Sequence, residues 1–268
     1  MKDLKIFANK VRNHVLDMTS RGGSSHVGSA LSIVDILAVL YGEIMYYDCK
    51  NPKLQSRDRF ILSKGHAGAA VYATLSEVGF FDKNLLKNHY QNGSKFSGHV
   101  SHKDIPGVEL STGSLGHGLG VGIGMAISAN RRRENHYVYV LLSDGELDEG
   151  SNWESFLFAS HHKLSNLIAI IDYNKLQSIS SISKTLELEP LVDKFKSFGW
   201  SVEESDGHNY ENLINSFKTA KSNSKPTVVL CHTVKGKGVS FMENSVLWHY
   251  RSPIGEEYEK AKNELNID

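Results

Sequence analysis

The sequence predicts an α/β fold in which a mainly parallel sheet is covered by helices on both faces. Three hydrophobic runs have the length of buried strands: "YVYVLLS" (137–143), "LIAIIDY" (167–173) and "PTVVLCH" (226–232). Segments with helical character separate or precede these runs, at 150–163, 190–198 and 209–221. Strands that are apolar throughout and alternate with helices are typical of a parallel sheet buried on both sides.

The bulk composition is that of an ordinary globular protein. The 268 residues include 30 Lys plus Arg, 30 Asp plus Glu and 40% hydrophobic residues, and we find no linker or internal repeat. We therefore predict a single domain over 1–268. A net charge of zero does not favour a nucleic-acid or membrane surface, and no stretch is apolar for the ~18 residues of a membrane span. The isolated Cys49 and Cys231 and the absence of a signal-peptide pattern favour the cytoplasm.

The first hundred residues are expected to be helices joined by loops rich in small residues. Leu4, Phe7 and Val11 recur at helical spacing, which predicts a helix over 3–19. A Gly/Ser-rich stretch, "TSRGGSSHVGSALS" (19–32), is expected to be a loop. The segments that follow are a buried helix over 31–41, a polar loop over 49–59, a loop "SKGHAG" (63–68) and a small-residue helix over 67–75.

The middle of the chain changes from irregular to regular. Residues 91–113 are polar, and a loop of that length in a compact domain is usually functional or disordered. "GSLGHGLGVGIGMAISAN" (113–130) predicts a glycine-rich turn that enters a helix, and the three arginines at 131–133 suit a helix C-terminus. "GWSVEES" (199–205) predicts a further strand, and 255–265 a polar helix or tail.

A polar turn follows each of two neighbouring predicted strands. Asp144 comes just after one strand and Asn174 just after the next, thirty positions later. One βαβ unit would bring these strand ends together, and carboxylate, amide and main-chain oxygens are the ligands that Mg²⁺ prefers. Gly145 leaves room for a phosphate, and the following helix presents its positive end. The pattern predicts a metal–diphosphate site, although Asp-Gly is also an ordinary turn.

Five histidines lie in stretches that we expect to be loops: His26, His66, His99, His117 and His249. Small neighbours let a ligand reach an imidazole, which can hydrogen-bond hydroxyl groups and move protons near neutral pH. A polyhydroxylated substrate with a carbonyl group would use such a set. The spacing does not favour zinc, because no HxxxH or HxH pair faces the loops, and His161 and His162 are adjacent in a predicted helix.

Nine stretches, in order, cover almost the whole chain and together match a known family. They are "SSHVGSALSIVDILAVLY", "RDRFILSKGHAG", "SGHV", "PGVELSTGSLGHGLGVGIGMA", "YVYVLLSDGELDEGSNWE", "LIAIIDYNKLQS", "LEPLVDKFKSFGW", "DGH" and "HTVKGKGVSFMENSVLWH". The chain resembles the N-terminal half of transketolases, which is their thiamine diphosphate-binding domain. It is most similar to the separately encoded N-terminal subunit found in some bacteria and archaea. The resemblance implies the PP-type α/β fold of that domain.

The resemblance assigns the metal and diphosphate site. Asp144 and Asn174 would hold Mg²⁺ (or Ca²⁺), with the main-chain carbonyl of Leu176 as the third protein ligand. Gly145 would contact the diphosphate of the cofactor. The other acidic residues of this turn, Glu146, Asp148 and Glu149, are expected to start the next helix. Glu149 is also expected to lie at a subunit interface.

The resemblance also assigns residues around the rest of the cofactor and the substrate. His66 and His249 would touch the cofactor near its phosphates. The aminopyrimidine would be lined by Gly113, Ser114 and Leu115. The sugar, near C2 of the thiazolium ring, would be faced by His26, His99 and His249.

The implied activity is the transfer of a two-carbon ketol unit from a ketose (phosphate) to an aldose (phosphate). Thiamine diphosphate would supply the carbanion chemistry, while the protein orients the substrate, stabilises charge and transfers protons. The chain ends where the family's pyrimidine-binding domain would begin. The resemblance therefore implies a C-terminal partner subunit that contributes a glutamate to the aminopyrimidine, in an α₂β₂ assembly with the active site between the chains.

Three positions depart from the family's pattern. Ser143 replaces the first glycine of Gly-Asp-Gly, His117 stands where glutamine is common, and Tyr250 replaces the glycine of Trp-His-Gly. Altered cofactor binding, an unusual sugar and neutral drift are all compatible with these changes. Two other functions stay open: a different thiamine diphosphate-dependent ketol or acyl transferase acting on a specialised sugar, and a non-catalytic scaffold or regulatory subunit.

Overall fold

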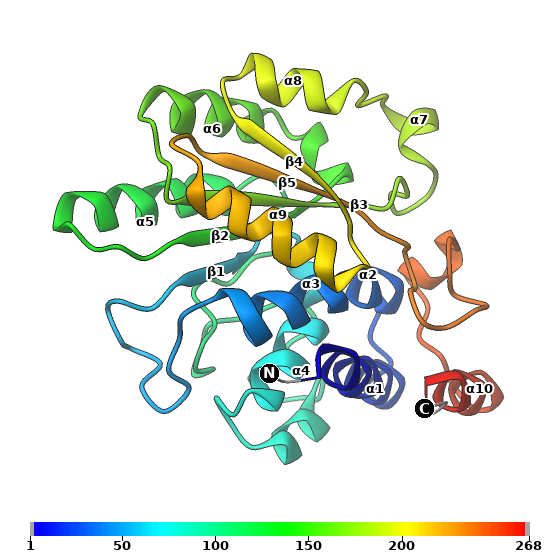
Figure 1. Cartoon of the computed structure of the whole chain (residues 1–268). Helices are drawn as coiled ribbons and strands as arrows, with labels where there is room; N and C mark the ends of the chain where they lie inside the picture. The colour runs from blue at the N-terminus through cyan, green and yellow to red at the C-terminus, as the bar shows by residue number, and fades with distance from the viewer. Residues whose placement is uncertain (1–2, 266–268) are drawn as a thin grey trace.

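The computed structural model describes residues 3–265 and has a five-stranded parallel sheet at its centre (Figure 1). The strands are β1 (Arg59–Leu62), β2 (Val138–Ser143), β3 (Leu167–Tyr173), β4 (Ser201–Asp206) and β5 (Thr227–His232), in the spatial order β1-β2-β3-β5-β4. Every pairing is parallel. In the register of β2 and β3, Ser143 lies opposite Asp172, so the residues that follow these two strands emerge at the same edge.

Helices cover both faces of the sheet, which confirms the predicted fold class (Figure 1). One face carries α1 (Leu4–Gly22), α2 (Val27–Ser32), α3 (Val34–Val39), α4 (Gly68–Glu77) and α9 (Tyr210–Ser222). The other carries α5 (Gly118–Arg132), α6 (Gly150–His161) and α8 (Leu191–Ser197), while α10 (Glu256–Leu265) packs beside α1. Successive strand residues point to opposite faces, so along β2 Tyr139 joins one apolar cluster and Val140 the other.

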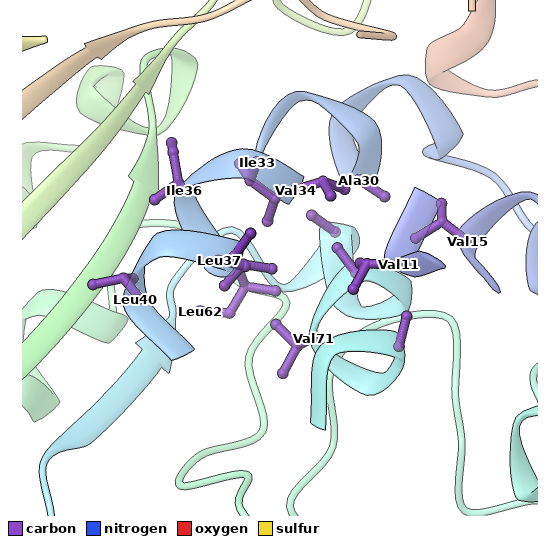
Figure 2. Close-up of a cluster of buried hydrophobic side chains, with 14 of the residues drawn as sticks. Val11, Val15, Ala30, Ile33, Val34, Ile36, Leu37, Leu40, Leu62 and Val71 are labelled. Atoms are coloured by element: carbon purple, nitrogen blue, oxygen red, sulfur yellow. The ribbon is translucent and has the colours of Figure 1, made fainter. Parts of the chain in front are cut away.

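The larger apolar cluster lies between the sheet and the N-terminal helices. Figure 2 shows Val11 of α1, Leu37 of α3, Leu62 of β1 and Val71 of α4 within it. These side chains are 0–3% exposed. Burying side chains of this size stabilises a fold by about 1.5–3 kcal/mol each, so the cluster fixes these helices against the sheet.

The Gly/Ser-rich stretch predicted as a loop is largely helical, so that prediction is wrong. α1 continues to Gly22, and α2 begins at Val27. A Cβ added at Gly28 would lie 3.4 Å from the Lys235 side chain and from the Trp248 carbonyl oxygen. The small residues therefore let a buried helix approach neighbouring segments closely.

The single helix predicted over 31–41 is also wrong in its bounds. The structure has α2 and α3 separated at Ile33, where φ is −100° and ψ is 0°, and then a π-helical turn (Leu40–Ile44). All of the residues from Val27 to Val39 are buried. A segment that is buried on every side has no clear hydrophobic periodicity from which a break can be read.

One strand and two short helices of the structure were not predicted from the sequence. β1 was not predicted because its four residues follow a polar loop directly and are shorter than a typical strand run. The short helix α7 (Ile182–Thr185) and the 3₁₀ helix Lys83–Asn88 were also missed. None of the helices found within residues 3–265 combines the length and the apolar character that crossing a membrane requires.

Candidate active site

A cavity of about 210 Å³ opens at the carboxyl ends of β2 and β3 and brings together residues far apart in the sequence. Its walls include Ser143, Lys235 and Tyr250, together with seven of the predicted site residues: His66, Leu115, Asp144, Gly145, Asn174, Leu176 and His249. A larger cleft of about 910 Å³ lies by α1 and α10, and no predicted site residue lines it.

Asp144 is buried at the start of a 3₁₀ turn (Gly145–Asp148), with 1% of its surface exposed. Its Oδ1 accepts a hydrogen bond from Gly145 N at 2.7 Å, and its Oδ2 accepts one from Lys175 N at 2.6 Å. Burial, and then the nearby Asp172 carboxylate, raise the pKa of Asp144 to about 7. No cationic side chain within the described residues forms an ion pair with Asp144, so a bound cation would supply the missing positive charge.

The other two predicted metal ligands lie in the turn after β3. Asn174 Nδ2 donates to Asp172 Oδ2 at 3.1 Å, and Asn174 Oδ1 accepts from Leu176 N at 3.1 Å. The Leu176 carbonyl accepts from Lys235 Nζ at 3.2 Å. Three oxygen donors of the types that Mg²⁺ prefers therefore line one cavity and fit such an ion, which would share or replace the hydrogen bonds just described.

Lys235 is a site residue that the sequence analysis did not single out. It is 2% exposed, and its ammonium donates to the carbonyls of Leu176 and Gln177 and to His249 Nδ1, at 3.2, 2.9 and 2.9 Å. Burial, and then the charge of Lys64, lower the pKa of Lys235 to about 8. The sequence signal that could have indicated Lys235 is its position in "HTVKGKG", between the turn that carries Asn174 and the stretch that carries His249. A buried cation on this wall suits a phosphate-bearing ligand.

A second buried lysine, Lys64, stabilises the turn after β3 through Asp172. Lys64 and Asp172 are both fully buried, and Lys64 Nζ lies 2.5 Å from Asp172 Oδ2. Asp172 also accepts hydrogen bonds from Ser32 Oγ, at 2.7 Å, and from Thr233 Oγ1. Burial alone would raise the pKa of Asp172, but the Lys64 ammonium and these hydrogen bonds hold it below its ordinary value. The carboxylate therefore stays ionised and fixes Asn174.

Four of the five predicted histidines converge beside the cavity. The His26 ring centroid lies 5.1 Å from that of His66, 5.6 Å from that of His99 and 4.9 Å from that of His249. His117 does not join them, because it is exposed at the start of α5, with its Nδ1 2.8 Å from the Leu115 carbonyl. The four come from the start of α2, the turn after β1, the 91–113 loop and the C-terminal region, so only the tertiary structure assembles the group.

Three of the converging histidines, His26, His66 and His249, are neutral near pH 7 because their pKa values are lowered. Burial, and then neighbouring charged groups, lower the pKa of His26 to about 4 and that of His249 to about 3. Burial also holds the pKa of His66 well below its ordinary value. Because the Lys235 ammonium can only donate, His249 Nδ1 accepts, and the ring proton of His249 is on Nε2. His249 can therefore donate a hydrogen bond from Nε2 without carrying a charge.

Of the three residues predicted to face the aminopyrimidine, only Leu115 lines the cavity. Gly113 is exposed and lies against the imidazole of His99, since an added Cβ would be 3.4 Å from His99 Cδ2. Ser114 is exposed and lies outside the cavity wall.

Glu146 does not start the next helix, so that part of the acidic-turn prediction is wrong. It is fully buried, and its carboxylate accepts from Gly116 N at 2.9 Å, Ser143 N at 3.3 Å and Ser63 Oγ. α6 begins later, with Glu149 at its N-cap. An acidic residue in a turn can satisfy backbone N–H groups of other loops, and sequence alone does not distinguish this from helix capping.

Ser143, which replaces the first glycine of the family's motif, causes no backbone strain. Its φ is not positive, and its hydroxyl accepts from Glu146 N at 3.2 Å. Tyr250, the other departure at the cavity, is 63% exposed, and its ring centroid lies 4.7 Å from that of His249 and 5.9 Å from that of His26. Tyr250 thus flanks the histidines at the mouth of the cavity.

Comparison with known proteins matches this arrangement to one family. The family described as "Transketolase, thiamine diphosphate binding domain" matches residues 4–268. The chain belongs to the transketolase family. It is 39% identical to an apulose-4-phosphate transketolase subunit of Phocaeicola vulgatus over 267 residues, covering 99% of this chain and 95% of that protein. It is also 39% identical over 264 residues to the 6-deoxy-6-sulfo-D-fructose transketolase subunit SqwG of Clostridium sp., covering 98% and 96%.

Longer transketolases match only over part of their length. Human transketolase is 38% identical over 250 residues, which cover 93% of this chain and 40% of the human protein. The crystal structure of the Campylobacter jejuni transketolase superposes with a TM-score of 0.93 at 33% identity, over 100% of this chain and 43% of that one. This transketolase-family chain therefore spans about two fifths of the solved transketolases, and it has the fold of their thiamine diphosphate-binding domain.

Proposed function

We propose that this chain is the N-terminal subunit of a two-subunit transketolase, which transfers a two-carbon ketol unit from a ketose (phosphate) to an aldose (phosphate). The observation that carries the proposal is the cavity in which three oxygen donors and a buried lysine adjoin the neutral histidines His26, His66 and His249. The first set suits a metal-bound diphosphate, and the second suits a substrate with several hydroxyl groups.

The cofactor and metal would be held by residues at the strand ends. Thiamine diphosphate supplies the carbanion needed to cleave a ketose beside its carbonyl. Asp144, Asn174 and the Leu176 carbonyl would bind Mg²⁺ (or Ca²⁺), and Gly145 and Lys235 would contact the diphosphate. The remaining cofactor contacts are assigned to His66, His249, Gly113, Ser114 and Leu115.

The sugar would be bound by His26, His99 and His249. As neutral imidazoles, His26 and His249 can donate to substrate oxygens and stabilise an alkoxide as it forms, without the desolvation cost of a buried cation. Because these histidines lie beside the residues that line the cavity, the diphosphate and the sugar would occupy neighbouring sides of one site.

The proposal includes a C-terminal partner subunit that completes the active site in an α₂β₂ assembly. Its support is that the chain covers most of two relatives named as transketolase subunits but only about two fifths of the solved transketolases. We assign residues 1–268 to a single thiamine diphosphate-binding domain, with Glu149 at the interface and the cytoplasm as the place of action. The substrates would be pentose phosphates or related sugars.

Turnover of xylulose 5-phosphate with ribose 5-phosphate tests the proposal, with thiamine diphosphate and Mg²⁺ present. The chain is assayed alone, mixed with its partner, and mixed as the Asp144→Ala variant. We expect activity only in the wild-type mixture. A wild-type mixture that fails to bind thiamine diphosphate would refute the catalytic function and favour a scaffold or regulatory subunit.

A ketol transferase for a specialised sugar is the second candidate. The exposed Tyr250 at the cavity mouth and the substrates named for the two relatives favour it. A mixture that binds thiamine diphosphate but leaves the pentose phosphates unchanged would select this candidate. Apulose 4-phosphate and 6-deoxy-6-sulfofructose would then be the first sugars to assay.

A further inference from the structure

A network of polar side chains lies on the side of the Val234–Lys237 segment that faces α1 and α3. Its centre is Asp35, a residue of α3 that is 3% exposed. Asp35 pairs with Arg12, lies 2.8 Å from His208 Nδ1 and accepts a hydrogen bond from the Tyr210 hydroxyl at 2.9 Å. None of these four side chains belongs to the site described above.

His208 connects this network to the backbone beside Lys235. Its Nε2 accepts a hydrogen bond from Val234 N at 2.8 Å, while its Nδ1 faces Asp35. A backbone N–H can only donate, so Nε2 carries no proton and Nδ1–H donates to the carboxylate. The two contacts therefore hold His208 as one neutral tautomer, in which each ring nitrogen has a defined role.

The network holds the segment on both sides of Lys235. His208 fixes Val234, and Arg12 Nε donates to the Lys237 carbonyl at 3.2 Å. Between them, the Lys235 ammonium extends into the cavity and bonds the Leu176 carbonyl and His249. The backbone on each side of Lys235 is thus held by a side chain, His208 or Arg12, that also contacts Asp35.

We propose that His208, oriented by Asp35, is a positioning residue that acts through Val234 to place the Lys235 ammonium for the cofactor's diphosphate. The inference rests on the proposed function, because it assigns the diphosphate to this wall of the cavity. In metal sites, replacing a residue that orients a metal-binding side chain commonly lowers affinity or activity about 10–100-fold, and we expect a loss of that order for an oriented lysine. The alternative is that His208 only stabilises the fold.

Two substitutions separate the two hydrogen bonds of His208. In His208→Gln, the side-chain oxygen lies near the place of Nε2 and can accept from Val234, while the contact with Asp35 is weakened. In His208→Asn, the amide nitrogen lies near the place of Nδ1 and can donate to Asp35, but Val234 N–H loses its acceptor. Tyr210→Phe is the matched control, because it removes a hydrogen bond to Asp35 without affecting the path to Val234.

Affinity for thiamine diphosphate is measured by calorimetry with Mg²⁺, on the chain mixed with its partner. We expect His208→Asn to bind at least about tenfold more weakly, and His208→Gln and Tyr210→Phe to stay within about threefold of wild type. The inference is wrong if His208→Asn binds thiamine diphosphate as tightly as wild type does. It is also wrong if His208→Asn and His208→Gln have the same affinity.

A double-mutant cycle with Lys235→Met separates positioning from general stabilisation. If His208 acts through Lys235, His208→Asn should cause little further loss once the ammonium is absent. Losses that simply multiply would show that His208 acts on the fold and not on Lys235.

Hydrogen exchange at the Val234 amide provides a readout that needs no cofactor. In the chain alone, we expect exchange about tenfold faster in His208→Asn and close to wild type in His208→Gln. Unchanged exchange in His208→Asn would overturn the inference whatever the enzyme does. A wild-type mixture without affinity for thiamine diphosphate would instead refute the proposed function, together with the role assigned to Lys235.

Discussion

At the scale of single residues, Glu146 shows how burial changes the meaning of an acidic side chain. Three donors converge on its carboxylate, from Ser63, Gly116 and Ser143. Burial raises the pKa of Glu146, while the same hydrogen bonds act in the opposite direction. The carboxylate joins the loop before α5 to the turn that carries Asp144, and so it supports the site without facing the cavity.

Replacing Glu146 by glutamine should destabilise the protein. In either orientation of the glutamine amide, its nitrogen would face hydrogen-bond donors: Ser143 N–H in one, and Ser63 and Gly116 in the other. These donors would lose their acceptor, and an unsatisfied buried group costs about 1–3 kcal/mol. Urea unfolding at neutral pH measures the loss. Glu154→Gln, at an exposed position of α6, is the control and should change the free energy of unfolding by less than about 0.5 kcal/mol. Equal midpoints for the two variants would contradict the prediction.

The low pKa values of His26 and His249 predict a specific dependence on pH. Histidine in the unfolded chain has a pKa near 6.5, so the unfolded state binds more protons below that pH. The stability that these groups contribute is complete above about pH 6.5 and is lost as the pH falls toward their folded values of about 4 and 3. We expect the free energy of unfolding of His26→Gln to fall less steeply than that of wild type between about pH 6.5 and 4.5.

NMR of the imidazole groups checks the same values directly. Both rings should remain neutral at about pH 5.5. A ring of either His26 or His249 that titrates near 6.5 in the folded chain would show that burial does not control its charge.

At the scale of elements, glycine spacing decides how closely α5 approaches the sheet. A Cβ added at Gly122 would lie 2.5 Å from Val140 Cγ2 of β2, whereas a Cβ at Gly124 would meet nothing within 4 Å. Both glycines lie within the same helix. Of these two glycines, Gly122 is therefore the one that the close packing of α5 against β2 requires.

Alanine at these two positions should have opposite effects. Overpacking at Gly122 costs about 1–3 kcal/mol against about 1 kcal/mol gained in helix propensity, so Gly122→Ala should lower the urea midpoint. Gly124→Ala gains propensity without a clash and should raise the midpoint, by up to about 1 kcal/mol in free energy. Shifts of the same sign in the two variants would contradict this account of the α5–β2 contact.

At the scale of the whole molecule, the Lys64–Asp172 ion pair joins segments from most of the chain. Lys64 follows β1, Asp172 belongs to β3, and Ser32 of α2 and Thr233 after β5 bond the same carboxylate. The pair is completely buried. Loss of one partner leaves an uncompensated charge in the interior, so these four segments depend on each other.

Lys64→Met should therefore destabilise the protein by about 3–5 kcal/mol, the usual cost of breaking a buried pair. Thermal unfolding measures the effect. Lys83→Met is the control, because Lys83 pairs with Glu77 from a half-exposed position where such a pair contributes about 0–1 kcal/mol. The prediction is wrong if the melting temperature of Lys64→Met falls no further than that of the control.

Prediction from the sequence succeeded where the signal is local. The runs at β2, β3 and β5 are apolar along their whole length, and the helices between them have recognisable periods and ends, so these elements and their parallel arrangement were predicted. The pairing of Asp144 with Asn174 followed from the geometry of one βαβ unit. The roles of the histidines came from the resemblance, and the structure brings four of the five together.

The fold class, the family and the location of the cavity could be read from the amino-acid sequence, because each depends on patterns among residues close in the chain or on ordered motifs. The helical state of α2, the burial of Glu146 and the roles of Lys235, Lys64 and His208 became visible in the three-dimensional structure. These residues owe their roles to partners distant in the sequence, such as Asp172 for Lys64 and Asp35 for His208. Burial and hydrogen bonding at such distances are set by how the layers pack, and no local spacing encodes them.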